Sequence, residues 1–174
     1  MGKFYLISKK AQAWGMDLII GFSIFIFVLS VFYIYSLNQS GGEINIIETL
    51  IYDGNLITNS IFSEGHPVEW NETNVTKIGI LSDNKINETK LESFYNLTKN
   101  NYDKTKILFN TKYDYYFFID PEFSFYDGKK EGIGKSGITR KNANQTSTNL
   151  IKITRFTVYK EKPVTAYLYI WDED

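Results

Sequence analysis

The chain has 174 residues and a formal net charge of −1, so its overall charge gives no basis for nucleic acid binding. It contains no cysteine, which excludes disulfides, thiolate metal sites and thiol nucleophiles, and its one histidine, His66, cannot form a histidine-rich zinc site alone. The 13 tyrosines, 13 phenylalanines and only 3 prolines are typical of a folded chain, long enough for one ordinary domain plus an appendage.

An uncharged apolar run lies close to the N-terminus, at residues 18–37, with the sequence LIIGFSIFIFVLSVFYIYSL. A helix over this range, at about 1.5 Å per residue, is about as long as a bilayer core is thick. Apolar side chains surround such a helix, whereas a soluble amphipathic helix would have a polar stripe. Tyr33 and Tyr35 near its far end are typical of a membrane interface. The run therefore predicts a transmembrane helix.

The charges that flank this run predict its orientation. Lys3, Lys9 and Lys10 precede the run, and no acidic residue occurs before Asp17. The positive-inside tendency then places the N-terminus in the cytoplasm and the C-terminal bulk outside the cell membrane. A cleaved secretory signal peptide is the competing interpretation. It fits less well because the run is longer than a typical signal core and only a vague small-x-small site follows it.

Asparagine-linked glycosylation motifs are more frequent than chance predicts. With 15 Asn, 12 Ser and 14 Thr in the chain, random placement gives about two Asn-x-Ser/Thr motifs. The sequence has six, which supports an extracytoplasmic surface that carries sugars at some of these sites. The alternative is fortunate spacing in a chain rich in Asn and Thr. The motifs begin at Asn38, Asn71, Asn74, Asn87, Asn96 and Asn144.

Residues 43–174 predict an extracytoplasmic α+β domain. A polar, glycine-rich segment at residues 38–42 predicts a bend or an end of the membrane helix. Isoleucine and leucine then recur at three- and four-residue steps, which predicts an amphipathic helix over residues 43–63. The next segment, residues 63–70, contains Gly and Pro and predicts a loop that Trp70 anchors on the core.

The middle of this domain predicts a strand followed by a helix. Residues 77–81 (KIGIL) favour a short strand, and residues 83–84 (Asp-Asn) favour the turn after it. Apolar and aromatic residues fall on one helical face over residues 87–109. Asn84 or Asn87 is the expected N-cap of that helix.

The C-terminal part predicts an antiparallel sheet. Residues 113–119 (YDYYFFI) are strand-like, and residues 129–149 are expected to form a long surface loop or an irregular hairpin. Two β-branched and aromatic runs, at residues 151–159 and 164–171, predict a hairpin connected by residues 160–163. Alternation along these runs predicts one buried and one solvent-exposed sheet face.

No convincing catalytic or metal-binding motif is found, so we expect neither an enzyme nor a bound cofactor or metal. The segment 128–137 (GKKEGIGKSG) lacks the spacing of a phosphate-binding loop and favours a flexible basic loop. Asp114, Asp120, Glu122 and Asp127 lack calcium-loop register and are interpreted as turn and solubility residues. His66 beside Pro67 is interpreted as a loop residue rather than a general base.

The motif Lys9-Lys10-Ala11-Gln12, followed by the apolar helix, resembles the class III signal peptide of archaeal type IV pilins and archaellins. In that family two basic residues and a small residue precede the cut made by a membrane-bound prepilin peptidase. The resemblance implies a leader of residues 1–11 and Gln12 as the mature N-terminus. Residues 12–39 would then be a membrane anchor that becomes the core helix of a filament.

Many members of that family carry an acidic residue five positions into the mature chain, whereas Asp17 would be the sixth here. By resemblance, Asp17 could pair with the freed amino group of Gln12 on a neighbouring subunit, because an unpaired carboxylate is expensive in hydrocarbon. The alternative is an Asp17 that lies at the membrane edge and stays hydrated.

The sequence therefore predicts a non-enzymatic, single-pass surface protein, pilin-like and assembling through its N-terminal helix with itself or with other subunits. Its expected partners are membrane lipid and a prepilin peptidase, and not nucleic acid. The alternative is an anchored surface protein whose head binds a ligand or partner without polymerising.

Overall fold

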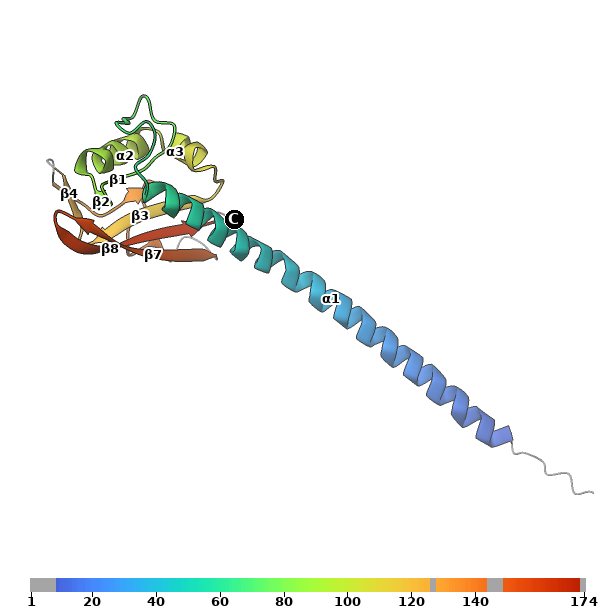
Figure 1. Cartoon of the computed structure of the whole chain (residues 1–174). Helices are drawn as coiled ribbons and strands as arrows, with labels where there is room; N and C mark the ends of the chain where they lie inside the picture. The colour runs from blue at the N-terminus through green and yellow to red at the C-terminus, as the bar shows by residue number, and fades with distance from the viewer. Residues whose placement is uncertain (1–8, 126–127, 144–148, 173–174) are drawn as a thin grey trace, which may run out of the picture. The chain divides into compact units, whose positions relative to one another are not determined.

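A computed structural model of the chain describes residues 9–125, 128–143 and 149–172. The first element, α1 (Lys9–Ile61), is a 53-residue helix, and the chain divides into two compact units at residue 45. The first unit contains the apolar part of α1, and the second, the head, contains α1 from Ile46 onward and all later elements (Figure 1). The predicted N-terminal helix and the predicted α+β head are both present.

The backbone of α1 stays helical through residues 38–42, so the helix does not end at the predicted polar break. Glycine lowers helix stability by about 1 kcal/mol relative to alanine, but it keeps its backbone N–H, which proline lacks. Two adjacent glycines, Gly41 and Gly42, therefore weaken a long helix without interrupting its hydrogen bonds.

The head contains a four-stranded antiparallel sheet with the order β6-β3-β8-β7. The predicted C-terminal hairpin is confirmed, and its strands pair along their whole length from Leu150–Trp171 to Tyr159–Lys162. The turn is only Lys160 and Glu161, both at positive φ, and so is two residues shorter than predicted. The strands are β3 (Asp114–Asp120), β6 (Ile133–Gly134), β7 (Leu150–Tyr159) and β8 (Lys162–Trp171).

Two helices replace the single helix predicted over residues 87–109: α2 (Glu88–Asn100) and α3 (Tyr102–Phe109). Asn87 is the N-cap of α2, as predicted, and its Oδ1 accepts a hydrogen bond from the Lys90 amide at 3.1 Å. Asn101 breaks the helical run because it caps α3 in the same way, through the Lys104 amide at 3.0 Å. A capping side chain at Asn101 thus competes with continuation of α2.

The strand predicted over residues 77–81 is wrong, because only Leu81 belongs to a strand. The hydrogen bonds of this segment go instead to the end of α1 and the following loop: Ile80 N donates to Ile61 O at 2.8 Å, and Leu81 N to Ser63 O at 2.9 Å. Trp70 anchors the loop as predicted, since its Nε1 donates to Gly79 O at 2.7 Å. The predicted turn at residues 83–84 connects β1 (Leu81–Ser82) and β2 (Lys85–Ile86).

Both faces of the sheet are covered in its centre, so the prediction of one solvent-exposed face holds only at the β7 edge. The main core lies between one sheet face and the layer formed by α1, α2 and α3 (Figure 1). A second apolar cluster lies on the opposite face, where Ile138, Ala143 and Leu150 pack against the strands. On β7, by contrast, the side chain of Phe156 is 84% exposed. The buried strand residues of this second cluster are Tyr116, Phe118, Tyr169 and Trp171.

Within the head, Gly54 allows α1 to approach the sheet closely. A Cβ atom at this position would lie 2.6 Å from Ile153 Cδ1 and 3.1 Å from Ile170 Cγ2. The three most deeply buried positions of α1 lie on the same side: Leu50, Ile57 and Ile61 are all fully inaccessible to solvent. The glycine that weakens the predicted amphipathic pattern is therefore a packing residue.

A short ribbon lies beside the main sheet. It consists of β4 (Phe123–Phe125) and β5 (Gly128–Lys130), which pair antiparallel. Together with β6, β5 lies in the region predicted as a long loop or irregular hairpin over residues 129–149. This region therefore contains more strand than expected and leads into the pocket described below.

Candidate functional site

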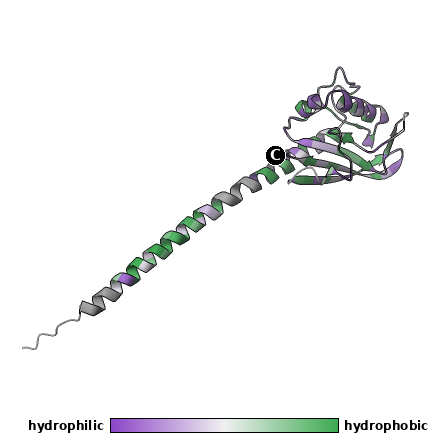
Figure 2. Cartoon of the chain, turned by 180° about the vertical axis from the view of Figure 1, so that it is seen from behind, coloured by the Kyte–Doolittle hydropathy of each residue, from purple (hydrophilic) through white to green (hydrophobic). Residues whose placement is uncertain are grey.

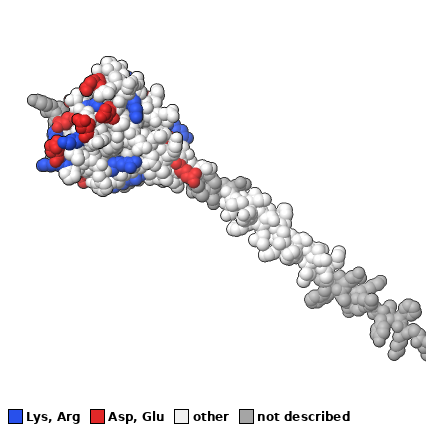
Figure 3. Space-filling model, viewed as in Figure 1, with Lys and Arg blue, Asp and Glu red and all other residues white. Residues whose placement is uncertain are grey.

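The apolar part of α1 is the first candidate site. Residues Gly15–Leu37, 23 in number, are long and apolar enough to cross a membrane by length and composition. All side chains of residues 15–37 are exposed, and the large apolar ones keep between 45% and 74% of their surface accessible. Figure 2 shows this segment as a continuous apolar stretch, and Figure 3 shows charged residues of both signs on the head. An uncovered apolar surface of this extent requires lipid or protein around it.

Two serine hydroxyls of this segment are satisfied within the helix. Ser23 and Ser30 each donate their hydroxyl to the carbonyl four residues earlier, at 2.8 Å. Such internal hydrogen bonds remove the need for water and suit an apolar environment. Asp17 is exposed near the start of the same segment.

The predicted processing residues lie at the beginning of α1. The backbone of Lys9, Lys10, Ala11 and Gln12 is helical, and residues 1–8 of the predicted leader lie outside the described residues. Cleavage between Ala11 and Gln12 stays a prediction.

The predicted glycosylation motifs occupy different environments. Asn71 and Asn74 are exposed in one loop, where Asn74 Oδ1 accepts from the Asn71 amide at 2.7 Å. Asn87 is half-buried because its Oδ1 caps α2 and its Nδ2 donates to Ser82 Oγ at 3.2 Å. Asn96 is half-buried on α2. Asn38 lies in the α1 backbone, and Asn144 lies outside the described residues.

A buried carboxylate at the start of β3 binds three side chains. Asp114 receives Lys106 Nζ at 3.0 Å on one oxygen and Lys135 Nζ at 2.8 Å on the other. The Tyr102 hydroxyl donates to Asp114 at 3.0 Å and accepts from the amide of Tyr115 at 2.9 Å. This Asp114 centre joins α3, β3 and the segment after β6. The interpretation of Asp114 as a turn or solubility residue is therefore wrong.

The surroundings of Asp114 keep it ionised. Burial by itself would raise the pKa of this carboxyl, but its bonds to Lys135, Lys106 and Tyr102 outweigh burial and hold the pKa below its usual value. Burial raises the pKa of Tyr102 well above that of a free tyrosine. Both groups thus stay in one protonation state near neutral pH. This constancy suits a structural ion-pair centre better than a general acid or base.

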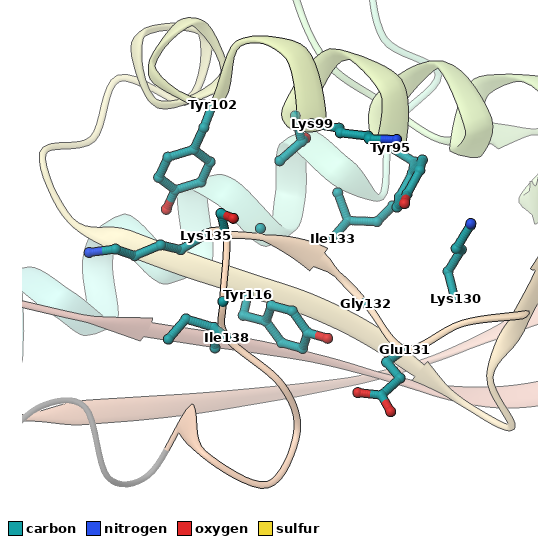
Figure 4. Close-up of a pocket in the computed structure, with 14 residues that line it drawn as sticks. Tyr95, Lys99, Tyr102, Tyr116, Lys130, Glu131, Gly132, Ile133, Lys135 and Ile138 are labelled. Carbon is teal, nitrogen blue, oxygen red and sulfur yellow. The ribbon is translucent and has the colours of Figure 1, made fainter.

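Beside the Asp114 centre, a half-open pocket of about 350 Å³ separates the helices from the strand segment 130–138. Figure 4 shows Tyr95, Lys99 and Tyr102 on the helical side, with Tyr116 on β3 below them. Gly132 lies against the Tyr116 ring, which a Cβ atom at residue 132 would overlap. The other residues that line the pocket are Thr98, Lys130, Glu131, Ile133, Gly134, Lys135, Ser136, Gly137 and Ile138.

The glycine-rich segment of this pocket does not have the geometry of a phosphate-binding loop. Gly134 ends β6, and no α-helix begins among the described residues that follow, up to residue 143. The ammonium group of Lys135 is bound to Asp114. His66 is exposed and lies outside the pocket, and the described residues contain no group of three His, Cys, Asp or Glu able to hold a metal ion.

The sequence analysis did not identify the pocket or the Asp114 centre. Their residues come from α2, α3, β3 and the segment 130–138, which only the tertiary fold brings together. The one local signal was an acid inside a strongly apolar strand, YDYYFFI, since buried acids need partners.

Comparisons with known proteins leave these residues as the only guide to function. No protein-family model matches the chain, and neither the curated proteins nor the solved structures include one with significant similarity to it.

Proposed function

We propose that the chain is a non-enzymatic, pilin-like surface protein that is anchored in the cell membrane by α1 and carries its head outside. One observation carries the proposal: the apolar surface of residues 15–37 is exposed throughout and directly follows the motif Lys9-Lys10-Ala11-Gln12. An anchor and a filament helix both need such a surface, first against lipid and then against other copies.

The processing step follows from the motif. Lys9 and Lys10 hold the leader on the cytoplasmic side, where a prepilin peptidase would hydrolyse the peptide bond between Ala11 and Gln12. The product keeps α1 and gains an amino group at Gln12. Asp17, exposed on the same helix, is the carboxylate that would pair with this amino group on a neighbouring copy.

Mass spectrometry of the N-terminus tests the processing step in cells with an active prepilin peptidase. We expect a mature chain that begins at Gln12. The double variant Lys9→Gln, Lys10→Gln should remain uncut, whereas the matched variant Lys3→Gln, which removes a lysine outside the motif, should be processed normally. A native chain that keeps Met1 in these cells would contradict the pilin-like function.

The second candidate function is a membrane-anchored protein whose head binds a ligand without polymerising. The pocket beside Tyr116 favours it, because pockets of about 300 Å³ and more are typical of small-molecule sites. Electron microscopy and N-terminal mass spectrometry of the protein from cells with an active prepilin peptidase separate the two functions: filaments support a pilin subunit, and dispersed molecules that keep Met1 support a simple anchor.

A further inference from the structure

One wall of the pocket carries a hydroxyl group, that of Tyr116. Tyr116 is only 4% exposed and lines the pocket, yet among the described residues its hydroxyl has no hydrogen-bond partner. The buried side-chain atoms without a partner in the described part of the chain are Arg140 Nε and Trp171 Nε1, so the Tyr116 hydroxyl meets the solvent of the pocket, where a ligand group can replace water. The position of Tyr116 is fixed by its pairing with Tyr169 on β8 and by the Gly132 backbone.

The Tyr116 hydroxyl is a hydrogen-bond donor throughout the physiological pH range. Burial raises its pKa to about 12, the negative charges of Glu131 and Glu122 add to this effect, and Arg140 opposes it. A ligand atom next to the Tyr116 hydroxyl must therefore be able to accept a hydrogen bond.

Opposite chemistry surrounds this donor. Glu131 contributes a carboxylate acceptor, while Lys99 and Lys130 contribute ammonium donors from the helical and the strand side (Figure 4). A single free anion fits poorly, because Glu131 would repel it and Lys135 is already bound to Asp114. A wholly apolar ligand also fits poorly, because it would displace water from the Tyr116 hydroxyl and from Glu131 without replacing its hydrogen bonds.

The pocket has an apolar side as well. Ile133 and Ile138 line it together with the edge of Tyr95, whose ring is covered by Lys130 Nζ at 5.3 Å from the ring centroid. The ligand must therefore combine an apolar face with several groups that both donate and accept hydrogen bonds. Pyranose sugars have this combination, since their ring C–H groups form an apolar face and their hydroxyls both donate and accept.

We propose that this pocket binds a single pyranose unit, with one sugar hydroxyl accepting a hydrogen bond from the Tyr116 hydroxyl. Glu131 accepts from neighbouring sugar hydroxyls, and Lys99 donates to them. The site is independent of cleavage at Ala11 and of polymerisation, so it can be tested whether or not the chain forms filaments.

The test is calorimetric titration of the full chain, held in a detergent without a sugar head group, with methyl glycosides of glucose, galactose, mannose, N-acetylglucosamine and glucuronic acid. We expect at least one glycoside to bind. The variant Tyr116→Phe, which keeps the ring and removes only the hydroxyl, should weaken that binding about tenfold, the effect of one lost hydrogen bond.

The matched control is Tyr169→Phe. Tyr169 is the cross-strand partner of Tyr116 and is also buried, but it does not line the pocket, so its hydroxyl should be dispensable for binding. The proposal is overturned if no glycoside binds at about 10 mM, above the millimolar range of weak single-site ligands. It is equally overturned if the two phenylalanine variants bind the glycoside alike.

Discussion

One helix, α1, has two parts that differ in what covers their apolar side chains. From Ile46 to Ile61 the helix buries Leu50, Ile57 and Ile61 in the core of the head. Over residues 15–37 every side chain is exposed. Apolar composition alone therefore does not define the structural role of a helical segment. The same residue types form a domain core in one part of α1 and need an external partner in the other.

The largest expected effect is on the free energy of unfolding, when an isoleucine in each of the two parts is replaced by alanine. Ile57→Ala should lower the free energy of unfolding of the head by about 2–5 kcal/mol, because it leaves a cavity in a fully buried site. Ile26→Ala, at a position that is 45% exposed, should leave this free energy unchanged. Chemical denaturation followed by tyrosine and tryptophan fluorescence measures both, and equal effects would contradict the division.

A charge introduced into each part should give the reverse order. Ile26→Arg, near the middle of the apolar segment, should make membrane insertion about 3 kcal/mol less favourable. Phe156→Arg places the same charge on an exposed β7 side chain and should leave insertion unaltered. The fraction of protein that resists alkaline extraction from membranes reports the difference. Full retention of Ile26→Arg would contradict a lipid-covered segment.

Inside the head, the Asp114 centre is an ionic group that is buried beside the apolar core, and its contribution to stability can be measured in the same way. Asp114→Asn leaves Lys106 and Lys135 without their carboxylate and should destabilise the head by about 2 kcal/mol, since both lysines keep some access to water. Asp120→Asn, at the exposed end of the same strand, serves as the control. An equal loss of stability in both variants would show that the buried Asp114 centre stabilises the head no more than an exposed carboxylate does.

Acid should remove part of the same stabilisation. Because the folded-state pKa of Asp114 is depressed, its contribution is present above the ordinary carboxyl pKa of 3.8 and is lost as the pH falls from there through the lower folded value. Denaturation curves recorded between pH 7 and pH 2 should therefore show a smaller acid-dependent loss of stability in Asp114→Asn than in the natural chain. Parallel pH profiles would contradict the shift.

The smallest expected effect concerns the glycosylation motifs on α2. Asn87→Ala removes the N-cap of α2 and should cost about 1 kcal/mol. Asn96→Ala, in the middle of the same helix, should be neutral or slightly stabilising because alanine favours helix. Both variants delete a motif, so thermal unfolding of unglycosylated protein separates the role of the cap from any role of a sugar.

The sequence predicts the elements whose signals are local. The membrane-length helix, the Asn87 cap and the hairpin at residues 150–171 follow from runs of residues that specify one period or one turn. Prediction from the sequence fails where contacts between distant segments determine the local structure. Residues 78–80 resemble a strand but bond to the end of α1 and pack Gly79 against Gly65.

Phe156 shows the same limit within a correctly predicted strand. It lies three positions from Ile153, which packs on the core, and a strand alternates every two, so the two side chains lie on opposite faces. The structure therefore exposes Phe156. The Asp114 centre and the Tyr116 pocket could not be predicted because they gather residues from three and from four segments, respectively, whose proximity no local pattern encodes.

The position of β8 in the sheet has a consequence for how the protein is made. This strand is synthesised after every other described element of the head, yet it lies between β3 and β7, and its Ile170 faces Gly54 of α1. The head therefore cannot close its core until β8 has been synthesised, and contacts between such distant segments form slowly. Before β8 pairs, Leu50, Ile57 and Ile61 lack part of the core that covers them in the folded head.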